Sequence, residues 1–315
     1  MDNGQLTQPQ NLPLTEFPIP LMTPHSARHV SVLPHEIRTL LAPAEGETWI
    51  DATTGVGGHA RLIAECLGST GRLIALDQDA QMLELARPRL EGLPVTWMQA
   101  NFDQLGAVLD LLEVKQVDGL LADLGFCSDQ LDDPQRGLSF QQDGPLDMRL
   151  DLTQGQPASE VVNRLPEREL ADLFWQLGEE RHSRRVARRI VEQRKETRFE
   201  TTTQLAELVR RCVPREKHHR IDPATRVFQA LRIYVNDELG SLERLLSQLP
   251  RVIRPGGRVG IISFHSLEDR RVKQTFQNSE AWEPLTKKPV QASEEEIARN
   301  PRSRSAKLRT AKRKI

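Results

Sequence analysis

A glycine-rich stretch, DATTGVGGH (51–59), contains the residue types that point most directly to ligand binding. Gly55, Gly57 and Gly58 can adopt positive φ angles and let a ligand approach the backbone closely. A helix starting directly after them would present free N–H groups to an anionic or polar ligand. Because Gly55 to Ala60 also satisfies the dinucleotide pattern G-x-G-x-x-A, the loop alone fits a nicotinamide cofactor as well as S-adenosylmethionine.

Acidic and aromatic residues near the ends of predicted strands favour S-adenosylmethionine. Asp51 lies four residues before Gly55, where methyltransferases carry an acid that helps to hold the methionine end of the cofactor. Asp77 suits the ribose hydroxyls of either cofactor, Phe102 in NFD (101–103) can pack on adenine, and Asp123 is expected at the edge of the active site. The pattern favours a methyltransferase, with a nicotinamide enzyme as the alternative.

These residues need a parallel sheet to bring them together. Short apolar runs alternate with helical stretches: strands are predicted at 47–55, 71–79, 94–102 and 117–125, and helices at 58–67 and 80–90. This alternation indicates an α/β fold with a doubly wound, Rossmann-like sheet. The carboxyl ends of its strands would carry the glycine loop and the acids.

The alternation of predicted strands and helices stops in the middle of the chain, which indicates an inserted domain. Residues 133–232 contain no convincing strand but helical stretches at 158–164, 167–177, 179–196 and 203–212, and the alternation resumes with a helix at 238–249, a strand at 254–266 and a helix at 267–277. We therefore expect a core of 24–132 and 233–315, an inserted helical substrate-recognition domain of 133–232, and a disordered leader, rich in Gln and Pro, at 1–23.

Charge is distributed unevenly although the net charge is −1. Residues 24–132 hold seven basic and sixteen acidic residues, whereas 233–315 hold seventeen basic and ten acidic ones. Basic surface in the later segments can meet a polyanion.

Cys66, Cys127 and Cys212 form no C-x-x-C pair, so no metal site is expected and the chain fits a reducing compartment. No apolar run is long enough to suggest a membrane span.

Eight strings in order make a more specific statement: HVSVL (29–33), DATTGVGGH (51–59), DLGFCSDQLDD (123–133), RGLSFQQDGPLDMR (136–149), GEER (178–181), PATRVFQALRIYVNDEL (223–239), ISFHSLEDR (262–270) and NPRSRSAKLR (300–309). From about residue 29 to 310 the chain closely resembles the RsmH (MraW) family of 16S ribosomal RNA cytosine-N4 methyltransferases. The resemblance implies a class I methyltransferase sheet with an inserted helical domain. It implies S-adenosylmethionine as cofactor and a cytidine of the decoding region as substrate.

Carried over residue by residue, the resemblance implies cofactor contacts from Gly57, Gly58, His59, Asp77, Phe102, Asp123 and Gln130. Asp123, or backbone carbonyls of 124–127, would accept the N4 hydrogens near the reaction centre. Structural roles remain open beside these functional ones. His59 could simply start a helix, Phe102 could belong to the core, and Asp77 or Asp123 could cap a helix or form a turn.

Two positions depart from the family pattern. Cys127 stands where the family usually has Ser, and Asp129 where it has Pro or another residue. A cysteine could serve a C5-cytosine mechanism, in which a thiolate attacks the ring. Methylation of an exocyclic amine needs no covalent activation, so N4 transfer remains the favoured reading. DLGF (123–126) also lacks the two prolines that follow the corresponding strand in DNA amine methyltransferases.

Three basic segments are candidates for RNA contact. One helix carries Arg184, Arg185, Arg188 and Arg189 opposite Val186 and Ile190, which predicts one basic and one buried face. REKHHR (215–220) is a basic loop, and 299–315 has eight Lys or Arg and no acid. Such arginines would grip phosphates without reading sequence, although a solvated tail and a salt-bridged helix face are the alternatives.

Base contacts are expected from a different set of side chains, namely Asp147, Arg149, Ser263 and His265, which offer mixed donors and acceptors. A structural hydrogen-bonding role for His265 stays open. We expect a cytoplasmic enzyme whose partner is 16S RNA or the small ribosomal subunit, with no membrane and no DNA. A nicotinamide oxidoreductase and a non-catalytic ribosome-assembly factor are the competing functions.

Overall fold

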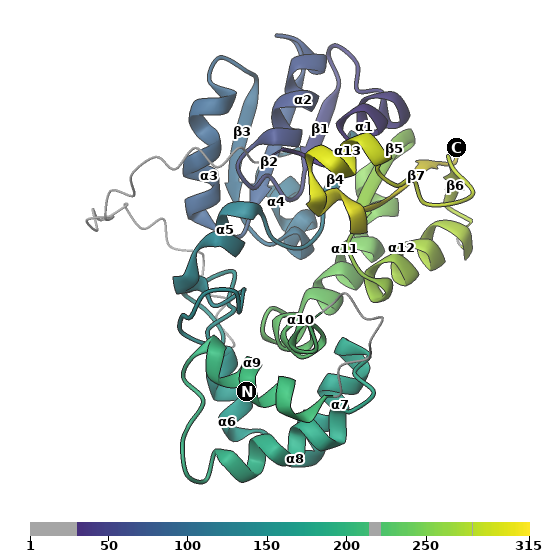
Figure 1. Ribbon diagram of the computed structural model, residues 1–315. Helices are drawn as coiled ribbons and strands as arrows, with labels where there is room; N and C mark the ends of the chain where they lie inside the picture. The colour runs from purple at the N-terminus through teal and green to yellow at the C-terminus, as the bar shows by residue number, and fades with distance from the viewer. Residues whose placement is uncertain (1–29, 214–221, 279) are drawn as a thin grey trace, which may run out of the picture.

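The computed structural model describes residues 30–213, 222–278 and 280–315 (Figure 1). The expected leader at 1–23 and the basic loop at 215–220 lie outside the described residues. In the part of the chain that the structure describes, no helix is long and apolar enough to cross a membrane.

A seven-stranded sheet forms the centre of the larger body, in the order β3-β2-β1-β4-β5-β7-β6. Its strands are β1 (Thr48–Asp51), β2 (Arg72–Asp77), β3 (Val95–Gln99), β4 (Val117–Asp123), β5 (Ile253–Ser263), β6 (Trp282–Pro284) and β7 (Lys307–Arg313). The first five pair in parallel, and β7 is antiparallel to both β5 and β6. The expected class I methyltransferase sheet is confirmed.

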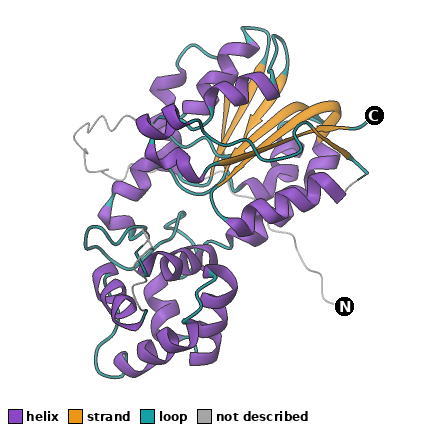
Figure 2. Cartoon of the chain, turned by 45° about the vertical axis from the view of Figure 1, so that its right-hand side comes forward, coloured by secondary structure: helices purple, strands orange, loops and turns teal. Residues whose placement is uncertain are grey.

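Helices cover both faces of this sheet (Figure 2). One apolar cluster joins the sheet to α4 (Leu105–Leu111), α11 (Glu238–Val252) and α12 (Ser266–Asn278). On the other face a second cluster contains α1 (Pro34–Leu41), α2 (Gly58–Leu67), α3 (Ala80–Ala86) and the 3₁₀ helix η1 (Arg87–Leu90). Since both faces are covered, β2 has a continuous apolar, fully buried interior.

The middle of the chain builds a separate helical body. It consists of α6 (Ala158–Arg164), α7 (Glu167–Gly178), α8 (Ser183–Gln193), α9 (Thr202–Cys212) and α10 (Ala224–Val235), and its own apolar core runs from Leu138 to Leu231. Two short elements, α5 (Ser128–Asp132) and η3 (Pro134–Arg136), lead from β4 into it, and α10 returns the chain to α11. Figure 1 shows this body below the sheet, with α10 closest to the core and α8 far from it.

The carboxyl-terminal segment corrects one expectation from the sequence. Residues 299–315 are not a basic tail, because α13 (Glu294–Arg299) and the 3₁₀ helix η4 (Pro301–Ser305) lead into β7 within the sheet. Leu308, Thr310 and Ala311 are buried, and even Arg309 is 8% exposed, where it pairs with Asp269 of α12. The segment's basic composition concealed four consecutive buried positions, 308–311.

Candidate active site

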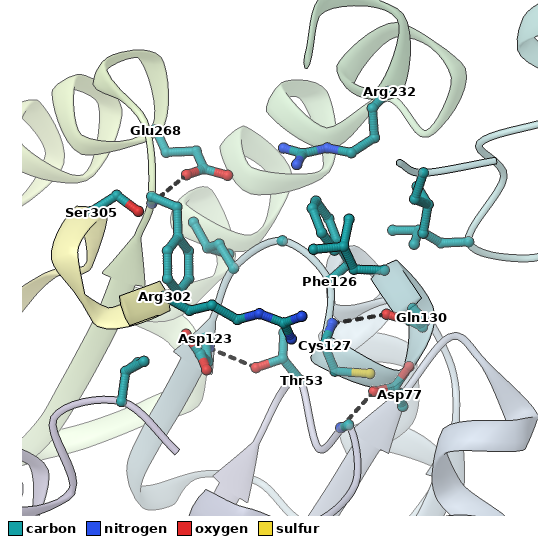
Figure 3. A pocket seen from close by; sticks show the side chains of 18 of the residues that line it. Thr53, Asp77, Asp123, Phe126, Cys127, Gln130, Arg232, Glu268, Arg302 and Ser305 are labelled. Atoms are coloured by element: carbon teal, nitrogen blue, oxygen red, sulfur yellow. Dashed lines mark hydrogen bonds between the residues drawn. The ribbon is translucent and has the colours of Figure 1, made fainter. Parts of the chain in front are cut away.

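A cavity of about 490 Å³ opens at the carboxyl ends of β1, β2 and β4 (Figure 3). This edge is where ligands bind in parallel α/β sheets. The residues that line the cavity come from two parts of the chain, which we call the inner and outer halves of the cavity. An inner half is lined by the glycine loop and strand ends, including Thr53, Gly58, His59, Asp77, Phe102 and Asp123, and an outer half is lined partly by the helical body, including Phe140, Phe228 and Arg232.

The glycine loop between β1 and α2 is shaped by positive φ angles. Gly55 has φ 51° and Gly57 has φ 88°. A Cβ on Gly57 would lie 2.5 Å from Leu90 Cδ1, so the loop packs directly on η1. Gly58 lines the cavity, whereas Gly57 is not among its lining residues. The structure thus gives Gly57 the role of the tight turn that lets Gly58 and His59 face the cavity.

Asp77 at the end of β2 ties this loop to the next one. Its Oδ2 accepts a hydrogen bond from Gly55 N at 2.8 Å, and its Oδ1 accepts one from Asp79 N at 2.9 Å. Burial raises the pKa of Asp77 to about 6, against these two hydrogen bonds. Each carboxylate oxygen keeps a lone pair for further donors such as ribose hydroxyls. Phe102 lines the same cavity and also packs against the core, so its position is compatible with either of its expected roles.

Asp123, His59 and Asp51 form a buried polar cluster at the floor of the cavity. His59 Nε2 and Asp123 Oδ2 lie 3.4 Å apart, and Asp123 N donates to Thr53 Oγ1 at 2.6 Å. Burial raises the pKa of Asp51 to about 7. Burial alone would lower the pKa of His59, but Asp123 and Asp51 outweigh it and raise that pKa. Asp51 itself is fully buried and does not line the cavity, and its Oδ1 accepts a hydrogen bond from Thr53 N at 3.1 Å.

This cluster leaves polar atoms without hydrogen-bond partners among the described residues, namely Asp51 Oδ2, both ring nitrogens of His59 and Asp123 Oδ1. Buried polar atoms without partners are costly and rare, so they indicate a ligand with polar groups of its own. An amino-acid end, with an ammonium and a carboxylate, fits a site that offers the Asp123 carboxylate and the His59 imidazole. The acidic side chains Asp77 and Asp123 in the lining suit a cationic sulfonium better than a pyrophosphate, which disfavours the nicotinamide alternative.

Gln130 is placed in the cavity wall by the turn that starts α5. Its Oε1 accepts from Cys127 N at 3.0 Å, and its Nε2 donates to Asp79 Oδ2 at 2.9 Å. Asp79 also pairs with Arg136, and both side chains are about 95% buried. Arg136 in turn donates to the Leu150 carbonyl. Asp79 and Arg136 were missed from the sequence, although Arg136 begins the string RGLSF, and they connect the core to the loop that enters the helical body.

Cys127 is unsuited to nucleophilic attack. Burial raises the pKa of its thiol to about 12, and its Sγ lies 3.2 Å from Met82 Sδ. A thiol with this pKa is protonated at neutral pH, whereas the nucleophile in C5 chemistry is the thiolate. The structure therefore disfavours the C5-cytosine alternative.

The residues expected to read bases lie in different places. Asp147 and Arg149 form a two-pronged ion pair with each other at 2.8 Å, and neither lines the cavity. Ser263 is 1% exposed, and its hydroxyl donates to the Lys307 carbonyl at 3.4 Å between β5 and β7. These three side chains are thus engaged in the fold. His265 lines the cavity, with its Nδ1 accepting from Glu268 N at the start of α12.

Glu238, His265 and Glu268 bring three possible metal-ligand atoms within 4.8 Å of one another. Arg232 occupies this grouping, since its Nε and Nη2 donate to the two oxygens of Glu238 at 2.7 and 2.9 Å. Glu268 also accepts a hydrogen bond from Phe264 N. Burial by itself would raise the pKa of Glu268, but His265 and Arg232 outweigh this effect and lower that pKa. The grouping is accordingly an ion-pair network held by an arginine.

On the helical body, the basic face of α8 comprises Arg184, Arg185, Arg188 and Arg189, which are all exposed, while Val186, Ala187 and Ile190 are buried. Of the four, Arg189 forms an ion pair with Glu192 at 2.7 Å. The two-faced helix expected from the sequence is thus present. Its basic face does not line the cavity.

Comparison with known proteins identifies relatives over nearly the whole chain. A ribosomal RNA small subunit methyltransferase H from Sorangium cellulosum is 50% identical over 94% of this chain and 94% of that protein. One from Trichormus variabilis is 52% identical over 91% of this chain and 92% of that protein. A solved putative rRNA methylase from Clostridium thermocellum aligns with 89% of this chain and 94% of that chain, at 12% identity and a TM-score of 0.44.

The family model of the MraW methylase family matches residues 26–314. This match covers both parts of the sheet and the helical body between them. It also includes the glycine loop, the polar cluster and both halves of the cavity. The chain belongs to the MraW methylase family.

Proposed function

We propose that this protein transfers a methyl group from S-adenosylmethionine to the exocyclic N4 of a cytidine in the decoding region of 16S ribosomal RNA. The observation that carries the proposal is the single cavity that joins the glycine loop and the acids at the strand ends to residues of the helical body. Relatives about 50% identical are named ribosomal RNA small subunit methyltransferases, which supports the RNA substrate.

The inner half of the cavity holds the cofactor. Asp77 accepts hydrogen bonds from the ribose hydroxyls, and Phe102 packs on the adenine. Gly58 and His59 bind the methionine end, where the unpartnered imidazole nitrogens find partners. Gln130 fixes the turn that closes this side. The bound cofactor supplies an electrophilic methyl group on a sulfonium.

The outer half holds the acceptor base, and Asp123 acts where the halves meet. The N4 amine of cytosine is a weak nucleophile because its lone pair is delocalised into the ring. Asp123 Oδ1, buried and without a partner among the described residues, accepts an N4 hydrogen. This hydrogen bond favours a pyramidal nitrogen and stabilises the positive charge that develops on it. The proton leaves to water after transfer, so no strong base is required.

RNA is gripped outside the cavity. The exposed basic face of α8 contacts phosphates, which position the substrate without specifying its sequence. The target base leaves its stack to enter the cavity. The substrate is RNA within the small subunit and not DNA, and the reaction takes place in the cytoplasm, where that substrate is found.

The test is mass spectrometry of 16S RNA nucleosides from cells with and without this protein. In vitro, the purified protein and labelled S-adenosylmethionine are given unmodified small subunits, the naked RNA or duplex DNA. Loss of N4-methylcytidine in the deletion, and its restoration in vitro, is expected. Binding to subunits without transfer would indicate an assembly factor, and a product at C5 would overturn the N4 assignment.

A further inference from the structure

The outer half of the cavity is aromatic to a degree that the cofactor does not explain. Phe126 follows β4, Phe140 lies in the loop from the core to the helical body, and Phe228 is on α10. Phe140 and Phe228 meet edge to face with ring centroids 4.7 Å apart. Flat aromatic surfaces suit a nucleobase, because bases stack favourably on such side chains.

Arg232 of α10 brings a fixed positive charge into this aromatic wall. Its guanidinium lies 4.6 Å from the centre of the Phe126 ring, and its side chain is only 14% exposed (Figure 3). Two nitrogens are used by Glu238, but among the described residues none accepts a hydrogen bond from Nη1. The arginine is thus held rigidly with donors left over at the cavity wall.

Asp123 and Arg232 offer complementary hydrogen-bonding groups to one base edge. Asp123 contributes a buried acceptor at the inner half, and Arg232 contributes donors in the outer half. The Watson–Crick edge of cytosine has the matching order, since the N4 amine donates while N3 and O2 accept. Uracil has an acceptor at O4 and a donor at N3. Its O4 would therefore face the acceptor of Asp123, and its N3–H would face the donors of Arg232.

We propose that Arg232 reads the target cytosine by donating hydrogen bonds to its N3 and O2 while the ring lies against Phe126. The inference rests on the proposed function, and it adds the residue that selects the base. Asp123 then meets the N4 amine at the other end of the same edge. Selection against uracil follows, because an unpaired buried donor or acceptor is penalised strongly.

The experiment combines one change in the enzyme with one change in the substrate, in the manner of a double-mutant cycle. Wild-type protein first methylates small subunits, and mass spectrometry locates the methylated cytidine. Subunits are then assembled from ligated RNA with either cytidine or 3-deazacytidine at that position, which replaces the N3 acceptor by C–H. The kcat/KM for both substrates is measured with wild type and with Arg232→Lys, a change that keeps the charge beside Glu238 but loses the planar fork.

Wild type is expected to use 3-deazacytidine about 10- to 100-fold less efficiently than cytidine, and Arg232→Lys to reduce this ratio to nearly one. Affinity for S-adenosylmethionine should change less than about twofold, since Arg232 lies in the outer half. Arg309→Lys is the matched control: it disturbs another buried ion pair, with Asp269, outside the cavity, and should preserve the wild-type ratio.

Equal ratios in wild type and Arg232→Lys would overturn the assignment, as would a wild-type enzyme that ignores the N3 replacement. If Arg232→Lys fails to fold, the double variant Arg232→Gln with Glu238→Gln is used instead, because it removes both buried charges. Its ratio of kcat/KM for cytidine to kcat/KM for 3-deazacytidine should also be nearly one. Failure of the proposed function is separate, because wild type would then yield no N4-methylcytidine in the first step.

Discussion

Replacing Asp77 by Asn should weaken S-adenosylmethionine binding and abolish part of its pH dependence. The carboxylate lines the inner half of the cavity and already accepts from Gly55 N and Asp79 N. Two further hydrogen bonds from ribose hydroxyls to a charged acceptor contribute roughly 1.5–3 kcal/mol in total. We therefore expect the dissociation constant to rise about 10- to 150-fold at pH 8.

The pH dependence has a definite sign. Burial raises the pKa of Asp77 to about 6 in the free protein. Hydroxyl donors favour the charged form, so binding lowers this pKa, and protonation weakens binding as the pH falls through about 6. From pH 7 to pH 5, wild-type affinity should lose about tenfold through this group. His59 and Asp51 titrate nearby, so only the difference between wild type and Asp77→Asn reports on Asp77.

Isothermal titration calorimetry from pH 5 to pH 8, with thermal melting of each protein, measures both effects. Asp103→Asn is the matched control, because Asp103 pairs with Arg244 of α11 and does not line the cavity. It should bind like wild type. An Asp77→Asn protein that melts normally and retains both the affinity and the pH profile of wild type would refute the role given to Asp77.

Three further outcomes are expected. Cys127→Ser should keep most methyl transfer, because a thiol with a pKa of about 12 is not the nucleophile; complete loss in a folded variant, with a trapped protein–RNA adduct, would contradict this. Reversing the basic face of α8 to Glu should leave cofactor affinity unchanged, weaken RNA binding and flatten its salt dependence by about one unit of slope per lost phosphate contact. An unaltered slope in filter-binding assays at several salt concentrations would exclude that face. Asp51→Asn should stabilise the free protein by up to about 4 kcal/mol at pH 8 but hardly at pH 4, because a carboxyl pKa raised from 3.8 to about 7 removes stability across that interval. Urea unfolding at both pH values measures this, and an equal effect at both would show that the charge of Asp51 is not the cause.

Local sequence patterns predicted the elements well where the pattern is made by near neighbours. The helix expected at 158–164 is α6, with the same bounds, and the first four strands appear where apolar runs end in Asp51, Asp77 and Asp123 or precede NFD. The patterns did not predict α4, α10, β6 or β7. The basic residues of β7 resembled those of a solvated tail. Its burial is set by pairing with β5 and β6, which are distant along the chain.

The glycine loop, the acids at the strand ends and the insertion of a helical body could be predicted from the sequence, because glycine conformations and hydrophobic periodicity are properties of short segments. Which polar groups remain free to bind a ligand depends on the tertiary structure. It paired Asp147 with Arg149 and buried Ser263, while it left Arg232 with a donor facing the cavity. Whether a side chain is free depends on partners that folding brings together from distant segments, and this pairing cannot be read from spacing.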